Sequence, residues 1–229
     1  INKQNSNTKF LPSLSSLLPL VNKISQREFL NELQIDTSEW LSLNTKDICS
    51  LNLPDGWEFP LMAKAAKGGY DGKGTRIIRS INELQSLLNN VEKSNWFLER
   101  WVQYEKELAI VVSRDIDGRF RHFPVVETFQ SQQVCDWVIA PANISHQLEI
   151  MIHNISMSIL SKLNYVGVMA IEFFYGHDGL KVNEIAPRVH NSAHFSIEAC
   201  NSSQFDQQIC IASGLQVPEP CMKTPGAIM

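Results

Sequence analysis

The segment 67–75, Lys-Gly-Gly-Tyr-Asp-Gly-Lys-Gly-Thr, restricts the fold of this chain more than any other stretch. A glycine inside a helix or a strand costs about 0.5–1 kcal/mol relative to alanine, and this segment holds several glycines. They are Gly68, Gly69, Gly72 and Gly74. The segment is therefore predicted to be a loop, and the strand-like residues 59–65 and 75–79 beside it indicate a hairpin. Such a loop could fold down over a bound nucleotide as a lid.

The same loop has the composition of a phosphate-binding segment. Successive glycines allow backbone N–H groups to converge on an anion, and the lysines around them add positive charge. A Walker A loop would need glycine at Lys67 and serine or threonine at Gly74, so that motif is absent. Ile77 takes the place of the last glycine of a dinucleotide fingerprint, which excludes that motif too. Composition alone leaves phosphate binding and an ordinary glycine-rich hairpin as open alternatives.

The composition of the whole chain is that of a globular protein, with 44% hydrophobic and 19% charged residues among 229. The net charge of −4 argues against nucleic-acid binding, which usually needs a basic face. No stretch approaches the about 18 apolar residues that span a membrane. The five cysteines are scattered and form no Cys-x-x-Cys pair, so we expect no zinc site, no disulfide framework and a cytoplasmic location.

Hydrophobic periodicity and turn residues predict both strands and helices. The predicted strands are residues 59–65, 75–79, 96–102, 107–113, 165–175 and 180–186. The predicted helices are residues 80–88, residues 148–163 and a segment from Ser196 that ends before Gly214. Capping-box patterns at Ser25–Glu28 and Ser80–Glu83 indicate two helix starts. Hairpins mixed with helices indicate an α+β fold with a mixed or antiparallel sheet.

Two glutamates are predicted to face each other across the last of these hairpins. If the chain turns about Asp178, residues whose numbers sum to 356 are paired, so that Glu172 lies opposite Glu184 and Phe174 opposite Val182. Opposed residues have Cβ atoms about 4.5–5.5 Å apart, where two like charges are destabilising.

These glutamates are expected to need a cation. The predicted register places Glu172 on a face with Val168 and Ala170, and Glu184 on a face with Leu180 and Val182. Two carboxylates on an apolar face can be neutralised by a hard divalent cation, of which Mg²⁺ is the usual one beside phosphates. A different register, with one or both glutamates solvated at a sheet edge, is the alternative.

A polar cluster follows Glu184 directly. Arg188, His190 and Asn191 combine a fork of donors, a titratable imidazole and an amide, which together suit a small oxyanion. A histidine in a loop is more often an ordinary surface residue, but its position beside an expected metal ligand favours a functional role.

These features together resemble the ATP-grasp carboxylate–amine ligases, and among them most closely the 5-(carboxyamino)imidazole ribonucleotide synthetases of purine biosynthesis. The matching segments are Lys64, Gly-Gly-Tyr-Asp-Gly-Lys-Gly at 68–74, Phe97-Leu-Glu-Arg-Trp-Val102, Glu172 and Asn183-Glu-Ile-Ala-Pro-Arg-Val-His-Asn191. The resemblance extends from about Gln26 to the end of the chain. It implies an ATP-grasp fold, in which two subdomains with mixed or antiparallel sheets enclose a nucleotide cleft.

The resemblance also implies roles for individual residues. The ATP-binding residues would be Lys64, Gly68, Gly69, Gly72, Gly74, Glu99, Val102 and Glu107, with Glu99 and Val102 at the adenine and Glu107 at the ribose. The Mg²⁺ ligands would be Glu172 and Glu184. Tyr70, Asp71 and Lys73 would face aminoimidazole ribonucleotide, Arg188, His190 and Asn191 would face bicarbonate, and Arg188 and Lys73 would be catalytic.

The implied chemistry is stepwise. ATP phosphorylates bicarbonate to carboxyphosphate, this releases carbon dioxide, and the amine of aminoimidazole ribonucleotide captures it. Water would destroy the intermediate, so the loop must open to admit ATP and then close. Ala186, Ala193, His194-Phe195 and Cys135-Asp-Trp-Val138 depart from common patterns of these ligases. None of these departures removes a proposed ligand.

The chain is expected to be a fragment, because it begins at Ile1 without methionine and ends in an apolar run at 226–229. The predicted parts are lead-in helices and a linker at 1–56, a lid subdomain with the glycine loop at 57–100, a large subdomain with the metal and bicarbonate sites at 101–217, and the start of a further domain at 218–229. The resemblance further implies a homodimer when the protein is intact.

Two alternatives remain open from the sequence. One is another ATP-grasp ligase, such as a biotin-carboxylase-like or formate-using enzyme, against which the cluster Arg188–Asn191 argues. The other is a non-catalytic ATP-binding module. A module without activity would be expected to lose some of Lys64, Glu172, Glu184 and Arg188, and all four are present.

Overall fold

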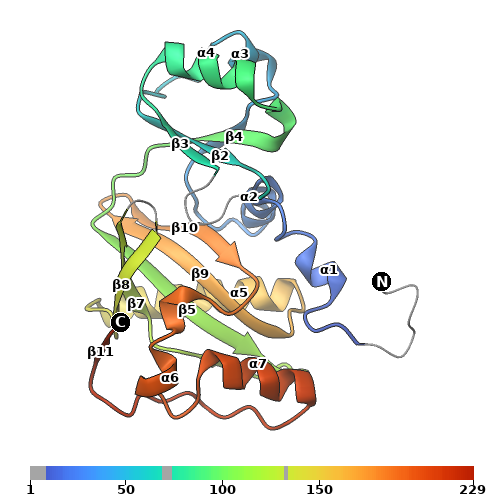
Figure 1. Ribbon diagram of the computed structural model, residues 1–229, viewed down its shortest axis with the longest axis vertical. Helices are drawn as coiled ribbons and strands as arrows, with labels where there is room; N and C mark the ends of the chain where they lie inside the picture. The colour runs from blue at the N-terminus through green and yellow to red at the C-terminus, as the bar shows by residue number, and fades with distance from the viewer. Residues whose placement is uncertain (1–8, 69–73, 132–133) are drawn as a thin grey trace.

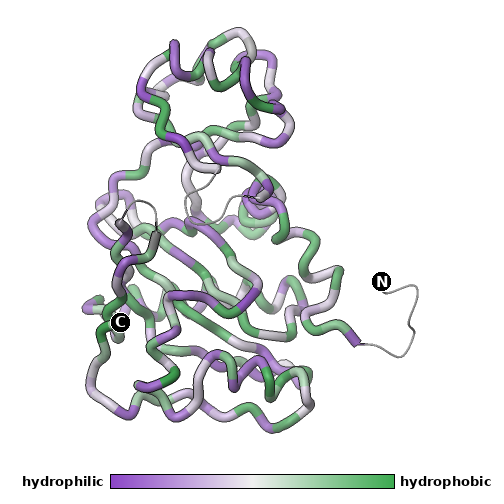
Figure 2. Tube along the Cα trace, viewed as in Figure 1, coloured by the Kyte–Doolittle hydropathy of each residue, from purple (hydrophilic) through white to green (hydrophobic). Residues whose placement is uncertain are grey.

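The computed structural model describes residues 9–68, 74–131 and 134–229. Figure 1 shows a small unit with a four-stranded sheet next to a larger unit built on a seven-stranded sheet, and helix α2 (Lys23–Glu32) between them. Hydrophobic segments occur in both units (Figure 2). Each unit has its own core of buried apolar side chains.

The small unit is an antiparallel sheet covered by helices. Its strands are β1 (Trp40–Ser42), β2 (Leu61–Ala65), β3 (Thr75–Ile78) and β4 (Trp96–Arg100), in the order β1-β4-β2-β3. Helices α3 (Lys46–Cys49) and α4 (Ile81–Asn90) and the short 3₁₀ helix Lys93–Asn95 complete it. Helix α4 begins where its capping pattern predicts, because the Ser80 hydroxyl accepts a hydrogen bond from the Glu83 N–H.

The large unit is built on antiparallel strands in the order β10-β9-β5-β7-β8-β11, with β6 paired to β5. Their bounds are β5 (Lys106–Arg114), β6 (Phe120–His122), β7 (Val126–Ser131), β8 (Val134–Ala140), β9 (Gly167–Gly176), β10 (Gly179–Ala186) and β11 (Ala227–Ile228). A turn at Asp115–Gly118 joins β5 to β6. Side chains alternate between the faces of such strands, so β5 contributes to two separate cores.

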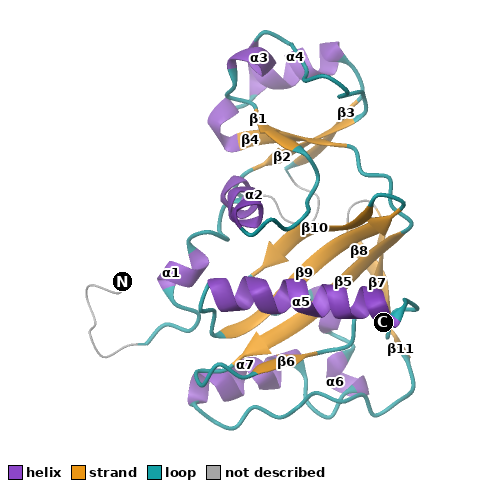
Figure 3. Cartoon of the chain, turned by 180° about the vertical axis from the view of Figure 1, so that it is seen from behind, coloured by secondary structure: helices purple, strands orange, loops and turns teal. Residues whose placement is uncertain are grey.

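One face of this sheet is covered by α5 (His146–Lys162), as Figure 3 shows. Leu108 and Ile110 of β5 belong to the core on this face, together with Leu148 and Ile152 of α5. The other face is covered by α6 (Ser196–Ala199) and α7 (Gln204–Ser213), and its core includes Ala109 and Ile211. Below, the side of the sheet covered by α5 is called the α5 face, and the core on it the α5 core. The side covered by α6 and α7 is called the α7 face.

The helices near the N-terminus differ from the prediction at one cap. Helix α1 (Leu14–Leu17) precedes α2, and α2 begins after Asn22, whose side chain accepts from the N–H groups of Ile24 and Ser25. The predicted helix start at Ser25 is therefore wrong, because Asn22 caps the first turn and Ser25 lies inside it.

One further prediction of secondary structure needs correction, and one hairpin is missing from the predictions. The helix expected from Ser196 to Gly214 is two helices, because Ser203 and Asp206 form a capping box that starts a new one; Gly214 ends it with φ 67°. The hairpin of β7 and β8 was not predicted. Its register shifts between Phe129 and Gln130, and this irregularity interrupts the alternation that a strand prediction needs.

None of the helices in the described parts of the chain is long and apolar enough to cross a membrane. Cys135, Cys200, Cys210 and Cys221 are free thiols.

Gly176→Ala should lower the free energy of unfolding by about 1–3 kcal/mol. A Cβ at this position would lie 3.0 Å from the carbonyl oxygen of Gln103 and 3.1 Å from Cα of Tyr104, so the connection between β4 and β5 would have to move. Urea unfolding measures the effect. The control is Gly226→Ala, whose nearest contact would be Ala140 O at 3.5 Å and which should change stability by less than about 0.5 kcal/mol. Equal stabilities of the two variants would contradict the prediction.

Candidate functional site

The centre of the site is a buried carboxylate that joins both units. Glu99 of β4 is only 3% exposed, and its oxygens accept from Arg27 Nε and Lys64 Nζ, each at 2.6 Å. Arg27 of α2 also donates through Nη2 to the carbonyl oxygen of Asn183 on β10, at 2.7 Å. A single side chain of α2 therefore connects the small sheet to the large one.

The charges of this cluster depend on each other. Burial alone would raise the pKa of Glu99, but the adjacent charges of Arg27 and Lys64 and their hydrogen bonds hold that pKa at about 2. Burial lowers the pKa of Lys64, Glu99 opposes this, and the charges of Arg27 and Lys23 lower it further. Glu99 is thus ionised at neutral pH, as the cations around it require.

The predicted carboxylate pair lies next to this cluster. Glu184 is the cross-strand partner of Glu172, which confirms the predicted pairing. Asn183 connects the two groups of charges, because Lys64 Nζ donates to its Oδ1 at 3.2 Å and its Nδ2 donates to Glu172 at 3.3 Å. The predicted ATP ligand Lys64 and metal ligand Glu172 therefore share one neighbour.

The register differs from the prediction at the turn. Gly179 pairs with Gly176 and Val182 with Phe173, so the predicted pairing of Phe174 with Val182 is wrong. The register then shifts between Val182 and Glu184, which makes Asn183 the extra residue of a β-bulge. This single extra residue brings Glu184 opposite Glu172.

The bulge also corrects the predicted face of Glu184. Leu180, Val182 and Ile185 all belong to the α5 core, so Glu184 does not share their face as predicted. It points instead to the α7 face, on which Glu172 lies beside Val168 and Ala170 as expected. A bulge commonly re-aims a side chain in this way, and here it puts both carboxylates on one side of the sheet.

The two carboxylates have different charge states. Burial raises the pKa of Glu172 to about 7, and the negative charges of Glu184 and Glu107 add to this shift. Burial would also raise the pKa of Glu184, but the charge and hydrogen bond of Lys23 lower it; Lys23 Nζ lies 2.5 Å from Glu184 Oε2. One carboxylate is therefore already neutralised by a lysine, and the other still lacks a full counter-charge.

The donor set fits a magnesium ion that is shared with a phosphate. Mg²⁺ prefers oxygen ligands and is usually held by one or two carboxylates together with water and phosphate oxygens. Within the described residues there is no group of three His, Cys, Asp or Glu side chains that could hold a metal ion. Glu172 and Glu184 could therefore supply two ligands, and a bound nucleotide would have to supply others.

The predicted bicarbonate cluster is only partly assembled. His190 Nε2 lies 3.3 Å from Glu172 Oε1, and burial, followed by the charge of Arg188, lowers the pKa of His190 to about 4. The imidazole is therefore neutral at pH 7. Arg188 and Asn191 are exposed, and the guanidinium of Arg188 donates to the carbonyl oxygen of Val189 at 2.8 Å.

The predicted ribose ligand Glu107 lies at the start of the central strand β5. Its cross-strand partners are Phe174 and Thr128, and burial raises its pKa. Val102 lies in the connection between β4 and β5, close in sequence to both Glu99 and Glu107.

The glycine loop is described only at its ends. Gly68 has φ 77° and Gly74 has φ 97°, a conformation typical of glycine. The remaining predicted loop residues lie outside the described parts of the chain. They are Gly69, Tyr70, Asp71, Gly72 and Lys73.

Four residues that position the side chains of this site were not among the predicted site residues. Lys23 and Arg27 are four positions apart on α2 and therefore lie on one helix face, which is the signal that could have identified them. Asn183 can be identified as part of the site only from the β-bulge that the structure shows. Gln204 is fully buried and exchanges hydrogen bonds with the backbone of His190, at 2.8 and 2.7 Å, and this fixes the loop that presents the imidazole.

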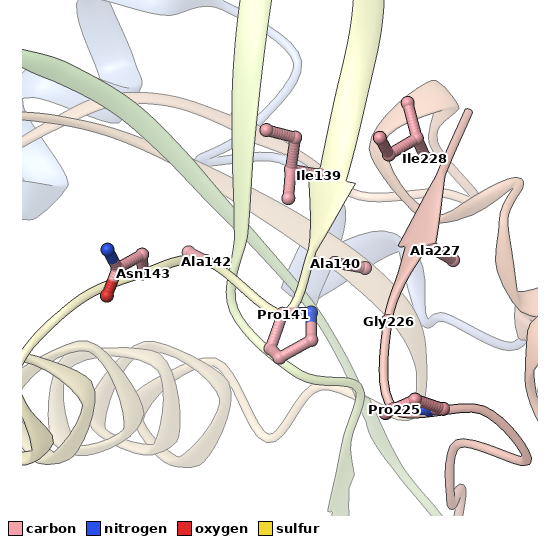
Figure 4. Close-up of a pocket in the computed structure, with 9 residues that line it drawn as sticks. All are labelled: Ile139, Ala140, Pro141, Ala142, Asn143, Pro225, Gly226, Ala227 and Ile228. Carbon is pink, nitrogen blue, oxygen red and sulfur yellow. The ribbon is translucent and has the colours of Figure 1, made fainter.

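Two pockets lie away from these residues. One has a volume of about 580 Å³ and is formed by the end of β8, the segment that follows it and β11 (Figure 4). A second lies along residues 31–41 with Pro54 and Trp57. Neither contains a predicted site residue, so the candidate site rests on its charges and hydrogen bonds.

Comparison with known proteins agrees with this geometry. The ATP-grasp domain family matches residues 28–205, which is most of the chain. The chain belongs to the ATP-grasp family. The match includes Glu99, both carboxylates of the pair and the cluster 188–191, and the predicted fold class is thereby confirmed.

Among ATP-grasp proteins, this chain is similar to the N5-carboxyaminoimidazole ribonucleotide synthase of Synechococcus elongatus. The two are 38% identical over 226 residues, which cover 99% of this chain and 57% of the relative. The N5-carboxyaminoimidazole synthetase of Staphylococcus aureus, solved with ADP, matches with a TM-score of 0.87 at 28% identity, over 97% of this chain and 59% of that one. The Aspergillus clavatus synthase in complex with ADP and 5-aminoimidazole ribonucleotide has a TM-score of 0.81 at 28% identity, over 93% and 56%.

Glu99→Gln should lower the free energy of unfolding of this ATP-grasp chain by about 3–5 kcal/mol at pH 7, because it leaves Arg27 and Lys64 buried without their counter-charge. The control is Glu39→Gln. Its bridge to Arg100 is 2.8 Å long but exposed, so its loss should cost less than about 1 kcal/mol. Chemical denaturation of both variants gives the comparison, and similar losses would contradict a central role for Glu99.

The effect of Glu99→Gln should shrink in acid. The folded-state pKa of Glu99 is about 2, below its ordinary value of 4.5, so its contribution is complete above about pH 4.5 and is lost as the pH falls toward 2. The contribution that disappears amounts to roughly 3 kcal/mol. The unfolding free energies of the wild type and of Glu99→Gln, measured at several pH values, test this. Parallel pH profiles of the two proteins would contradict it.

Proposed function

We propose that this chain is the ATP-binding part of an enzyme that carboxylates 5-aminoimidazole ribonucleotide with bicarbonate to form 5-(carboxyamino)imidazole ribonucleotide. The observation that carries the proposal is the pairing of Glu172 with Glu184 on one face, beside the Lys64–Glu99–Arg27 cluster that joins the two sheets. The chain spans 57% of the Synechococcus relative, so the complete reaction is proposed for a longer protein.

The nucleotide is proposed to lie between the two units. Lys64 and the glycine loop would contact its phosphates, Glu99 and Val102 would lie at the adenine, and Glu107 would accept hydrogen bonds from the ribose hydroxyls. Lys64 is supported in this role because Glu99 and Asn183 already hold its ammonium group. A preorganised cation needs little rearrangement when an anion arrives.

Glu172 and Glu184 would hold Mg²⁺ against the phosphates, and the ion would neutralise charge on the phosphoryl group that is transferred. The pKa of about 7 for Glu172 supports this, because a cation is what would keep this carboxylate ionised. Lys23 already neutralises Glu184 and would have to share that carboxylate with the ion.

The bicarbonate is proposed to bind near His190, with Arg188 and Asn191 as further donors. A neutral imidazole can donate a hydrogen bond without adding charge, and Gln204 holds the loop that presents it. Tyr70, Asp71 and Lys73 would face the imidazole ribonucleotide, with Arg188 and Lys73 as the catalytic residues.

The proposed reaction balances in three steps. A bicarbonate oxygen attacks the γ-phosphorus of ATP and ADP leaves, which gives carboxyphosphate. Its carbon–oxygen bond to the phosphate breaks and releases carbon dioxide and inorganic phosphate. The amine of the ribonucleotide then bonds to the carbon of carbon dioxide and loses a proton. Exclusion of water by the closed loop would protect the carboxyphosphate.

The cytoplasmic location and the homodimer expected from the sequence stay predictions. The same is true of the assignment of residues 1–56, 57–100, 101–217 and 218–229 to separate parts of the protein.

ADP release by the full gene product with Mg-ATP and bicarbonate should rise strongly when aminoimidazole ribonucleotide is added. Glu184→Gln should lower the stimulated rate by about 100-fold or more, since a metal ligand is lost. The control is Glu198→Gln, an exposed residue of α6 that should leave the rate unchanged. ATP binding without stimulation by the ribonucleotide would contradict the proposed acceptor, and an active Glu184→Gln enzyme would contradict the metal site.

A further inference from the structure

The loop that follows β10 folds back so that the side chain of its histidine caps the short 3₁₀ helix Asn191–Ala193. His190 Nδ1 accepts a hydrogen bond from the backbone N–H of Ser192, with the two nitrogens 3.4 Å apart. The hydroxyl oxygen of Ser192 lies 3.0 Å from the same ring nitrogen. Two polar groups of one residue therefore meet at a single atom of the imidazole.

These contacts decide which ring nitrogen carries the proton. A backbone N–H can only donate, so His190 Nδ1 must be the unprotonated nitrogen that accepts. A neutral imidazole then carries its one hydrogen on Nε2. Because Nδ1 is an acceptor, the Ser192 hydroxyl is a second donor to it. The structure thus selects one of the two neutral tautomers.

The protonated nitrogen lies beside the paired carboxylates. His190 Nε2 is 3.3 Å from Glu172 Oε1, so its N–H donates toward that oxygen. Both side chains are only partly exposed. The ring therefore has Ser192 at one nitrogen and the proposed metal ligand at the other.

The residues that hold this arrangement are buried. Ser192 is 1% exposed and Gln204 is fully buried. Gln204 accepts from the His190 N–H at 2.8 Å and donates to the His190 carbonyl oxygen at 2.7 Å. Gln204 therefore fixes the backbone of the histidine, and Ser192 fixes its ring.

We propose that Ser192 is a positioning residue that holds His190 in the Nε2–H tautomer, so that His190 acts at the bicarbonate site as a hydrogen-bond donor and not as a proton acceptor. The inference rests on the proposed function, since it takes His190 as a bicarbonate ligand. Bicarbonate and carboxyphosphate present negatively charged oxygens, which an oriented N–H stabilises. The lone pair of an unprotonated nitrogen at the same place would repel them.

The first test is the ¹⁵N spectrum of the imidazole rings in the full gene product at neutral pH. The shifts of the two ring nitrogens report which one is protonated, and the signals of His190 are those missing in His190→Gln. The wild type should show a protonated Nε2 and an unprotonated, hydrogen-bonded Nδ1. A His190 that carries its proton on Nδ1 would overturn the inference and leave the proposed function standing.

Ser192→Ala removes the hydroxyl and leaves only the longer contact from the backbone N–H. The two nitrogen shifts of His190 should therefore move toward each other as the tautomers mix. The KM for bicarbonate should rise by about two- to tenfold, the range expected for one hydrogen bond, and the KM for ATP should stay unchanged. If neither the spectrum nor the KM for bicarbonate changes, Ser192 has no positioning role.

The matched control is Ser156→Ala. Ser156 is also 1% exposed, and its hydroxyl donates within α5 to the carbonyl oxygen of Ile152 at 2.7 Å. This variant loses a buried hydroxyl far along the chain from the histidine. It should leave the His190 spectrum and both KM values as they are in the wild type.

A second test separates a donor from a base. In His190→Gln the side-chain amide can donate a hydrogen bond but cannot take up a proton at neutral pH. With Mg-ATP, bicarbonate and aminoimidazole ribonucleotide, His190→Gln should release ADP at least about tenfold faster than His190→Ala, as expected for one hydrogen bond to a charged group. Equal rates of the two variants would overturn the donor role. A wild type whose ADP release does not depend on bicarbonate would overturn the proposed function and the donor role with it, and the ¹⁵N spectrum would still decide the tautomer.

Discussion

The rest of the structure depends on the burial of Glu99 between Arg27 and Lys64. Removing a carboxylate from water costs several kcal/mol, and this cost is offset only when both cations approach it closely. Arg27 comes from α2, Lys64 from β2, and Arg27 also binds the backbone of β10. The ionised cluster can therefore form only when the small sheet, the helix and the large sheet are assembled. We infer that it fixes the relative position of the two halves of the candidate site.

The second constraint is the bulge at Asn183. Without this extra residue, Glu184 would continue the alternation of Leu180 and Val182 and would face the α5 core. With it, Glu184 faces the same side as Glu172, and the Asn183 amide links Lys64 to Glu172. One irregularity of the backbone thus brings the cationic cluster and the paired carboxylates into contact. Bulges are frequent beside active sites for this reason.

Proteins of the ATP-grasp family share this chain's architecture. In this chain the two paired glutamates have neighbours of different charge. Lys23 neutralises Glu184, whereas Glu172 has a neutral imidazole and an amide as its neighbours. Glu172 is therefore the carboxylate of the pair that lacks a full counter-charge, and it is where we propose that a cation binds. Lys64 lies at the other end of the Asn183 amide, where we propose that the phosphates lie. A magnesium nucleotide carries charges of both signs, on its metal and on its phosphates.

The sequence by itself determined those features that depend on local chemistry. The glycines of the loop, the cap at Ser80 and the stop at Gly214 follow from residue type and spacing, and the structure agrees at each position that it describes. The partners of Glu99 lie 72 and 35 residues away along the chain, and no local pattern connects them. Only the tertiary structure decided that Arg27 and Lys64 converge on this carboxylate, and that the bulge turns Glu184 to the other face. Long-range burial and register, which local propensity does not encode, are the physical reason.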